Sequence, residues 1–263
     1  MDADGFVIVK TKKRGSKKVS SSVEKRTTIL NTNEGDVTID KEVVLARVQK
    51  AKDDLKDSLY FKQFLEDFKD LTKARQIDKI YCFGLGHFSD SVTAKYQFAL
   101  LLCISEALEL PRSEIFLCDP IFYKDEVTLL ESKYSVQVIK DNIECLISCE
   151  SSYLIILPHC PAQMTNNLLF ANWRPGSLQN LILFANSVSN TANRPHENLV
   201  FIDKVVENGL LEEIPIKNSF KFQDIFNDMS LHKFKKSSFT GDSSFWELPK
   251  PVYESRNLEF ITK

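Results

Sequence analysis

Between residues 77 and 186, short uninterrupted apolar runs alternate with longer stretches of helical periodicity. Apolar runs of this length are typical of strands that are buried on both faces of a sheet. Strands that alternate with helices usually pair in parallel, with the helices covering the sheet. The pattern therefore predicts an α/β, Rossmann-like fold with a mostly parallel sheet of about five strands and helices on both faces. The expected strands are 80–83, 115–118, 136–139, 153–157 and 181–184.

An N-terminal helical extension precedes this alternating region. From about residue 41 to 75, apolar residues recur with helical spacing and charged residues occupy the remaining positions, which indicates one amphipathic helix or two. The stripe consists of Phe61, Phe64, Leu65, Phe68 and Leu71. Such a stripe is expected to pack on the core. Asp40 stands where a helix N-cap is needed.

The two ends of the chain differ from the region between them. Residues 1–38 are polar and rich in Ser and Thr, which predicts a disordered tail. Residues 1–26 hold eight basic and three acidic residues, a net +5. This basic tail is either a solubilising segment or an arm that aids nuclear entry or touches nucleic acid. We expect the folded domain at 39–235, with its core at 77–235, and a loosely ordered C-terminal segment at 236–263.

Composition excludes several classes of protein. The net charge of −2 over 263 residues creates no global attraction to nucleic acid, which leaves only weak contact through the basic tail. No apolar run approaches the ~20 residues that cross a bilayer, so no membrane association is expected. The six cysteines are scattered and form no CxxC pair. This usage predicts a reducing compartment, the cytoplasm, the nucleus or both.

Polar and glycine-rich residues follow the predicted strands at the edge where parallel sheets bind ligands. They predict a binding site that consists of Gly84, Gly86, His87, Ser89, Asp90, Asp119, His159 and Asn186. The glycines at 84 and 86 form half of a GxGxxG fingerprint, with Ser89 where the third glycine would stand. Asp119 occupies the position that binds a ribose in many Rossmann-like domains, or it starts a turn with Pro120.

Other interpretations of the same residues stay open. Ser89, Asp90 or Ser91 is expected to cap the following helix. His159 is a candidate general acid or base, and the neighbouring Cys160 a candidate nucleophile. A zinc site of His87, Asp119, His159 and Cys160 has suitable ligand types but no recognised spacing, and no metal site is predicted.

Five sequence motifs resemble those of the sensitivity-to-red-light-reduced (SRR-like) family. They are CFGLGHFSDS at 82–91 with Ala94, Gln97 and Leu100 after it, CDP at 118–120, LPHCP at 157–161, NNLL at 166–169 and FNDMSLHKF at 226–234. Met229 and Lys233 depart from the family's pattern, where a threonine and an aromatic residue are expected. The resemblance spans about 77–235.

The resemblance implies a regulatory role in circadian and light signalling, in haem biosynthesis, or in both. One hypothesis is a regulatory module that binds a small ligand or a protein partner at the sheet edge. The alternative is a nucleotide- or S-adenosylmethionine-dependent enzyme that uses the loop 84–91 and Asp119. The cofactor is not specified, and the candidate partners are a nucleotide-like small molecule, haem or a protein.

Overall fold

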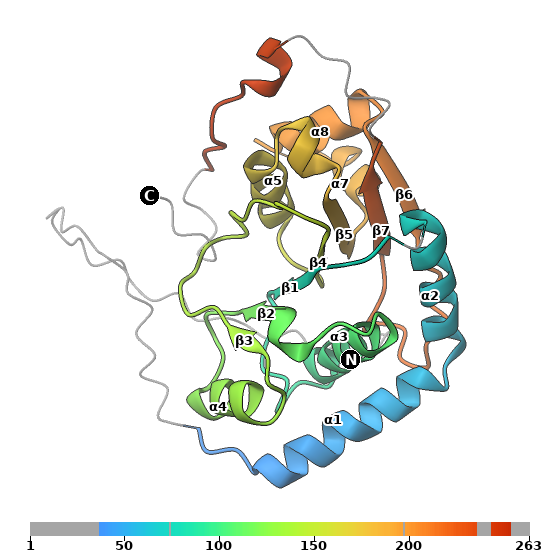
Figure 1. Cartoon of the computed structure of the whole chain (residues 1–263), viewed down its shortest axis with the longest axis vertical. Helices are drawn as coiled ribbons and strands as arrows, with labels where there is room; N and C mark the ends of the chain where they lie inside the picture. Colours follow the sequence, from blue (N-terminus) through green and yellow to red (C-terminus); the bar gives the residue numbers. More distant parts are fainter. Residues whose placement is uncertain (1–36, 74, 197, 236–242, 254–263) are drawn as a thin grey trace, which may run out of the picture. The chain divides into compact units, whose positions relative to one another are not determined.

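The computed structural model describes residues 37–73, 75–196, 198–235 and 243–253. Helices and strands alternate along the chain after two N-terminal helices (Figure 1). The strands are β1 (Lys79–Phe83), β2 (Ile115–Cys118), β3 (Gln137–Val138), β4 (Tyr153–Leu157), β5 (Leu181–Asn186), β6 (Leu211–Pro215) and β7 (Met229–Phe234). The helices are α1 (Lys41–Lys56), α2 (Leu59–Thr72), α3 (Val92–Ala107), α4 (Lys124–Ser132), α5 (Ala162–Ala171), α6 (Pro175–Leu178), α7 (Val188–Ala192) and α8 (Val200–Glu207). Short 3-10 turns lie at Arg112–Glu114 and Ser243–Trp246.

Within the described residues, the strands form one sheet of seven in the order β3-β2-β1-β4-β5-β7-β6. The first five strands in this order, from β3 to β5, pair with their neighbours in parallel. β7 runs antiparallel to both β5 and β6. The predicted Rossmann-like, mostly parallel sheet is therefore confirmed, and the strand order reverses between β1 and β4. In a fold of this type, that point is where ligands bind.

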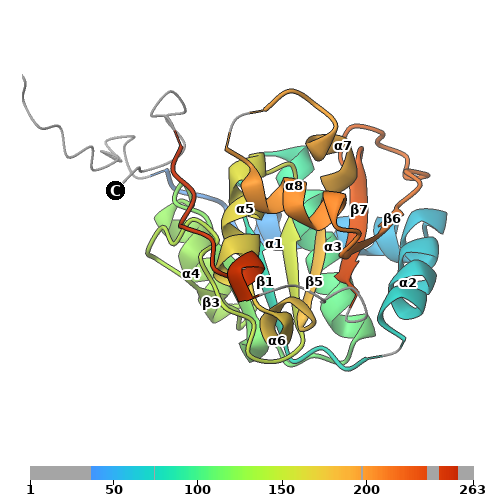
Figure 2. The same ribbon diagram turned by 90° about the horizontal axis from the view of Figure 1, so that it is seen from above.

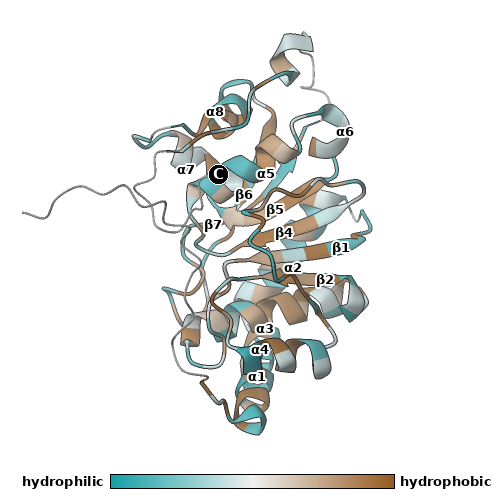
Figure 3. Ribbon diagram, turned by 90° about the vertical axis from the view of Figure 1, so that its left-hand side faces the viewer, coloured by the Kyte–Doolittle hydropathy of each residue, from teal (hydrophilic) through white to brown (hydrophobic). Residues whose placement is uncertain are grey.

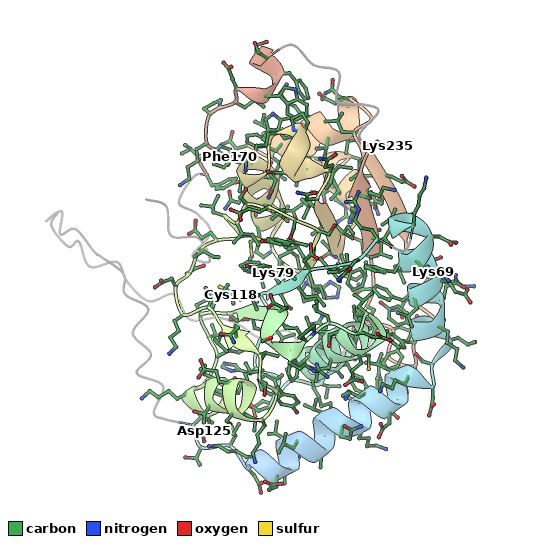
Figure 4. The ribbon with its side chains drawn as sticks, in the orientation of Figure 1. Lys69, Lys79, Cys118, Asp125, Phe170 and Lys235 are labelled. Atoms are coloured by element: carbon green, nitrogen blue, oxygen red, sulfur yellow. The ribbon has the colours of Figure 1, made fainter. Side chains whose placement is uncertain are left out.

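Helices cover both faces of the sheet, as the sequence predicted (Figures 1 and 2). One hydrophobic core joins α1, α2, α3 and α4 to one face of the strands, and a second joins α5, α7 and α8 to the other. Alternate residues of a strand serve the two cores: Leu154 and Ile156 lie in the first, and Ile155 and Leu157 in the second. β4 and β5 are accordingly apolar along most of their length (Figure 3). In Figure 4 the labels of Asp125 on α4 and Phe170 on α5 mark the helices on the two opposite sides of the sheet.

The helical extension forms two helices. The Asp40 side chain accepts a hydrogen bond from Val43 N–H and caps α1, as expected. The α2 stripe is buried apart from Leu65, which is partly buried. Phe64 of that stripe packs edge-on against Phe184 of β5, with 5.0 Å between ring centroids. The extension is therefore part of the main core.

The sequence did not indicate β6, β7 or α8. β7 carries Ser230, His232 and Lys233 among its apolar residues, and β6 carries two glutamates and Pro215. Charged residues and proline are typical of an edge strand such as β6, which needs no continuous apolar run. His232 is fully buried nonetheless, because its Nδ1–H donates to the Leu183 carbonyl at 3.2 Å.

The predicted basic tail lies outside the described residues, except for residues 37 and 38. Part of the C-terminal segment, 243–253, is described and contacts the second core. The Trp173 indole N–H donates to the Phe245 carbonyl at 2.8 Å, and the Trp173 ring packs against those of Phe245 and Trp246. Among the described residues, no helix has both the length and the apolar character needed to cross a membrane.

Candidate functional site

The four parallel strands β1, β2, β4 and β5 end at the same edge of the sheet, because neighbouring parallel strands point the same way. The predicted site residues follow these strand ends, in or beside the connecting loops. The point where the strand order reverses lies between the loop after β1 and the loop after β4.

The glycine loop after β1 has the backbone conformation that its two glycines permit. Gly84 and Gly86 have φ values of +65° and +78°, a region that other residues adopt only with strain. A Cβ on Gly84 would lie 2.5 Å from the Cys160 Sγ. The β4 loop therefore packs directly on the β1 loop. The Cys160 thiol donates to the Phe83 carbonyl at 3.3 Å and lies against this turn.

Asp119, at the end of β2, connects its own turn to the glycine loop. Its Oδ2 accepts a hydrogen bond from Gly86 N–H at 2.7 Å. Its Oδ1 accepts one from Ile121 N–H at 3.0 Å, which is the Asx-turn geometry expected of a turn initiator. The carboxylate thus stabilises its own turn and joins that turn to the glycine loop.

Glu126, a residue that the sequence analysis missed, organises the rest of the β1 loop. It is fully buried on α4. Its Oε1 accepts from Ser89 N–H at 2.9 Å and from Ser89 O–H at 2.8 Å. Its Oε2 accepts from His87 Nδ1 and Tyr123 N–H, both at 3.0 Å. A glutamate in the first helical turn often bonds back to the preceding backbone in this way, and that position was the available signal.

The remaining residues of this loop have separate roles. Ser91 caps α3 by accepting a hydrogen bond from Ala94 N–H at 3.2 Å. The expectation that a residue of 89–91 caps the helix is met by Ser91. Asp90 is exposed. The His87 ring stacks on Tyr123, with 3.7 Å between ring centroids.

His159 is held by hydrogen bonds at both ring nitrogens. Its Nε2 lies 3.1 Å from the Ile225 carbonyl oxygen and its Nδ1 lies 3.3 Å from the Asn186 side-chain nitrogen. A carbonyl oxygen can only accept, so Nε2 carries the proton and Nδ1 accepts from the amide. The imidazole therefore connects the end of β5 to the chain before β7 and has no nitrogen left for proton transfer.

A cavity of about 550 Å³ lies over the ends of β4 and β5. Its walls come from the β4 loop, the start of α5, α7, the loop after α7, Asp228 and Tyr253 of the C-terminal segment. The Tyr253 hydroxyl is held at this wall by Asn166 and Asn167 of α5, at 2.9 and 2.8 Å. The C-terminal segment thus completes the cavity.

The residues that line this cavity include buried polar atoms and positions with positive φ. Asn186 Oδ1 and His196 Nδ1 are buried and have no hydrogen-bond partner among the described residues, which is uncommon for buried polar atoms. His159, Asn198 and Asp228 have φ values of 54°, 60° and 54°. Asn, Asp and His adopt this left-handed region more readily than other residues, and five further non-glycine residues of the described chain adopt it outside the cavity.

The wall formed by α7 depends on a partly buried charged group, Glu213. His232 Nε2 accepts from Val188 N–H at 3.3 Å, and Glu213 of β6 accepts from Ser189 N–H and O–H at 3.0 and 2.6 Å. Burial by itself would raise the pKa of Glu213, but hydrogen bonds to its carboxylate, including those from Ser187 and Ser189, outweigh burial and lower that pKa. The ionised carboxylate therefore anchors the start of α7.

The structure divides the predicted site residues into two neighbouring groups. His159 and Asn186 line the cavity, together with Cys160. Gly86, His87, Ser89 and Asp119 lie in the hydrogen-bonded network of the β1 and β2 loops. Gly84 lies between the two groups, against Cys160. Within the described ranges, no three His, Cys, Asp or Glu side chains are grouped as a metal site would require.

The chain is similar to proteins of one family. The SRR1 domain profile matches residues 51–233. The SRR1-like protein of Drosophila melanogaster is 30% identical over 193 residues, which cover 72% of this chain and 67% of that protein. The SRR1-like protein of Mus musculus is 34% identical over 48% of this chain and 53% of its own length. The Arabidopsis thaliana protein named SENSITIVITY TO RED LIGHT REDUCED 1 is 26% identical over 58% of this chain and 59% of its own length.

The matched segment thus spans little more than half of the mouse and Arabidopsis relatives. Among solved structures, the PH0226 protein from Pyrococcus horikoshii aligns with a TM-score of 0.34 and 12% identity, over 68% of this chain and 93% of that one.

Proposed function

The chain belongs to the SRR1 domain family, and from this premise we propose that it is a regulatory protein whose carboxyl sheet edge binds a small ligand. The cavity over β4 and β5 carries the proposal. Its volume of about 550 Å³ suits a small molecule, since such sites measure roughly 300–1,000 Å³. The partnerless atoms of Asn186 and His196 are groups that a ligand, or a small shift on binding, would satisfy.

The regulated process that we propose is circadian or light signalling, haem biosynthesis, or both. The name of the Arabidopsis relative connects that protein with sensitivity to red light. The haem branch rests on the resemblance alone. Replacing the chromosomal copy with a cavity variant and measuring rhythm period and haem content would separate the branches. An unchanged period and an unchanged haem content would contradict both.

Ligand capture tests the site itself. The purified protein is incubated with a low-molecular-weight cell extract, and the retained compounds are identified by mass spectrometry. Ala162→Trp places a large ring at the start of α5, where Ala162 lines the cavity. The matched control is Leu59→Trp at the first position of α2, where the side chain is 73% exposed. We expect the wild type and the control to retain a compound that Ala162→Trp loses.

A second candidate is an S-adenosylmethionine- or nucleotide-dependent enzyme. The strand order favours it, because a reversed β7 lies between β5 and β6 beyond the parallel strands. S-adenosylmethionine-dependent methyltransferases share this arrangement, although a shared fold alone does not establish a shared reaction. The contact of Asp119 with the glycine loop is consistent with a ribose site at the β2 end.

Equilibrium dialysis with S-adenosylmethionine and with ATP tests this candidate. Asp119→Asn keeps the side-chain shape and removes the charge that a ribose hydroxyl would bond, so it should weaken binding about tenfold or more. Gly86→Val should abolish binding and cost ~1–3 kcal/mol of stability through its positive φ. Asp70→Asn on the exposed face of α2 is the control. Wild-type protein that binds neither compound would rule this candidate out.

A further inference from the structure

We propose that the ligand of the cavity over β4 and β5 is a small zwitterion of amino-acid type, with an ammonium group and an anionic group. The inference rests on the proposed function, because it names the chemistry of the same site. Its basis is an acceptor pair at the end of β5 and an arginine on another wall of the cavity that forms no ion pair with the described residues.

The orientation of the Asn186 amide follows from its neighbours. Ile225 O fixes the proton of His159 on Nε2, so His159 Nδ1 needs a donor. The structure directs the Asn186 NH₂ group toward His159 Nδ1, at 3.3 Å, and the amide oxygen the other way. That oxygen is buried and accepts no hydrogen bond from the described residues. The unmet requirement of Asn186, which lines the cavity, is thus a hydrogen-bond donor.

Asp228 places a negative charge beside the end of β5. Its carbonyl accepts from Ser187 N–H at 3.0 Å, which holds it next to Asn186. Its Oδ1 accepts from the Asn190 side chain at 3.0 Å, and its second oxygen accepts no hydrogen bond from the described residues. An ammonium group has three N–H donors and one positive charge. It would donate to the Asp228 carboxylate, and to the buried Asn186 oxygen after a small shift of that amide on binding.

Arg194 provides the opposite charge. It is exposed on the loop after α7 and lines the same cavity. Among the described residues, neither Arg194 nor Asp228 forms an ion pair. A guanidinium group binds carboxylates and phosphates through paired hydrogen bonds. A ligand with both charges would neutralise both residues.

The two histidines of the cavity do not alter this charge balance. Both ring nitrogens of His159 already have hydrogen-bond partners, the Ile225 carbonyl and the Asn186 side chain. His196 Nε2 lies 3.0 Å from Asp203 Oδ1, so any charge on its ring is balanced by that carboxylate. One cationic and one anionic side chain remain available to the ligand.

Calorimetric titration of the full chain tests the inference. The probes are glycine, L-alanine, L-leucine and L-glutamate, and for the tightest of them the matched amine and matched acid that each lack one charge. We expect at least one zwitterion to bind. Its two singly charged analogues should each bind about tenfold to a hundredfold more weakly, as expected for the loss of one charged contact.

Two variants assign the charges. Arg194→Gln should remove the preference of the protein for the zwitterion over the amine, which lacks the anionic group. Asp228→Asn should remove its preference for the zwitterion over the acid, which lacks the ammonium group. Asparagine tolerates positive φ, so Asp228→Asn should fold normally. Arg47→Gln and Asp70→Asn, on the exposed faces of α1 and α2, are the charge-matched controls and should bind as the wild type does.

The inference is overturned if no zwitterion binds, or if the amine or acid binds as tightly as the zwitterion. It is also overturned if the two cavity variants behave like the controls. If ligand capture still succeeds and Ala162→Trp abolishes it, the cavity remains a ligand site and only the zwitterion is wrong. If capture shows no cavity-dependent compound either, the proposed function fails as well.

Discussion

Replacing Gly84 with alanine tests the contact between the β1 and β4 loops, on which the arrangement of the site depends. Gly84 has a φ of +65°, and a Cβ added there would lie 2.5 Å from the Cys160 Sγ. The left-handed conformation costs alanine ~1–2 kcal/mol. The overlap with sulfur adds ~1–3 kcal/mol, as overpacking usually does. We therefore expect Gly84→Ala to lower the free energy of unfolding by about 2–5 kcal/mol.

Gly209→Ala is the matched control. Gly209 has a similar φ of +61°, but nothing lies within 4 Å of its added Cβ. It should show the conformational cost of ~1–2 kcal/mol alone. The difference between the two variants isolates the contact with Cys160.

A double-mutant cycle completes the test. Cys160→Ala removes the sulfur and should cost ~1 kcal/mol in lost packing. In the Gly84→Ala, Cys160→Ala double variant the overlap with sulfur disappears. The double variant should therefore lose ~1–3 kcal/mol less free energy of unfolding than the two single variants lose together. Urea unfolding followed by circular dichroism measures all four proteins. A coupling energy below ~0.5 kcal/mol, the level expected of independent sites, would refute the contact between the two loops.

Three further predictions concern other parts of the site. Glu213→Gln should cost ~1–3 kcal/mol at pH 7. Folding lowers the pKa of Glu213 from 4.5, so the stabilisation by its carboxylate is complete above pH 4.5 and is lost as the pH falls further. Urea unfolding at pH 3 and pH 7 measures this. The same difference in free energy of unfolding between wild type and variant at both pH values would be evidence against the ionised carboxylate. Tyr253→Phe should cost ~1–2 kcal/mol, because Asn166 and Asn167 lose their partner, and a melting temperature equal to that of the wild type would disprove the role of the C-terminal wall. Burial raises the pKa of Cys149 to about 12, so this thiol should resist iodoacetamide at pH 8 until the protein unfolds, which peptide mapping of the labelled protein measures.

The parallel half of the sheet could be predicted because burial on both faces requires continuous apolar strands. The strand at Tyr153–Leu157 is buried at every residue and matches the predicted bounds. β7 escaped prediction because buried polar residues, Ser230 and His232, interrupt its apolar pattern. The hydrogen bond from His232 to the Leu183 carbonyl of β5 makes the burial of its ring possible. A contact between strands that are 49 residues apart leaves no local sequence pattern.

The candidate site was predictable in its location but not in its connections. Strand ends of a parallel sheet share one edge, so His159 and Asn186 could be expected near each other, and the structure joins them by a hydrogen bond. Glu126, Arg194 and Asp228 had no motif to indicate them. They reach the site through the start of α4, the loop after α7 and the chain before β7, elements whose placement depends on tertiary packing.

The central claim is that the ligand of this SRR1 domain binds over the ends of β4 and β5. Two-dimensional NMR of ¹⁵N-labelled protein, before and after addition of a cell extract below 1 kDa, tests it most directly. The claim predicts shifted amide signals at 159–163, 186–196 and 228, the segments that line the cavity. Shifts confined to 84–91 and 119–126 would instead place the ligand on the glycine loop, and an unchanged spectrum would contradict a ligand site at this edge altogether.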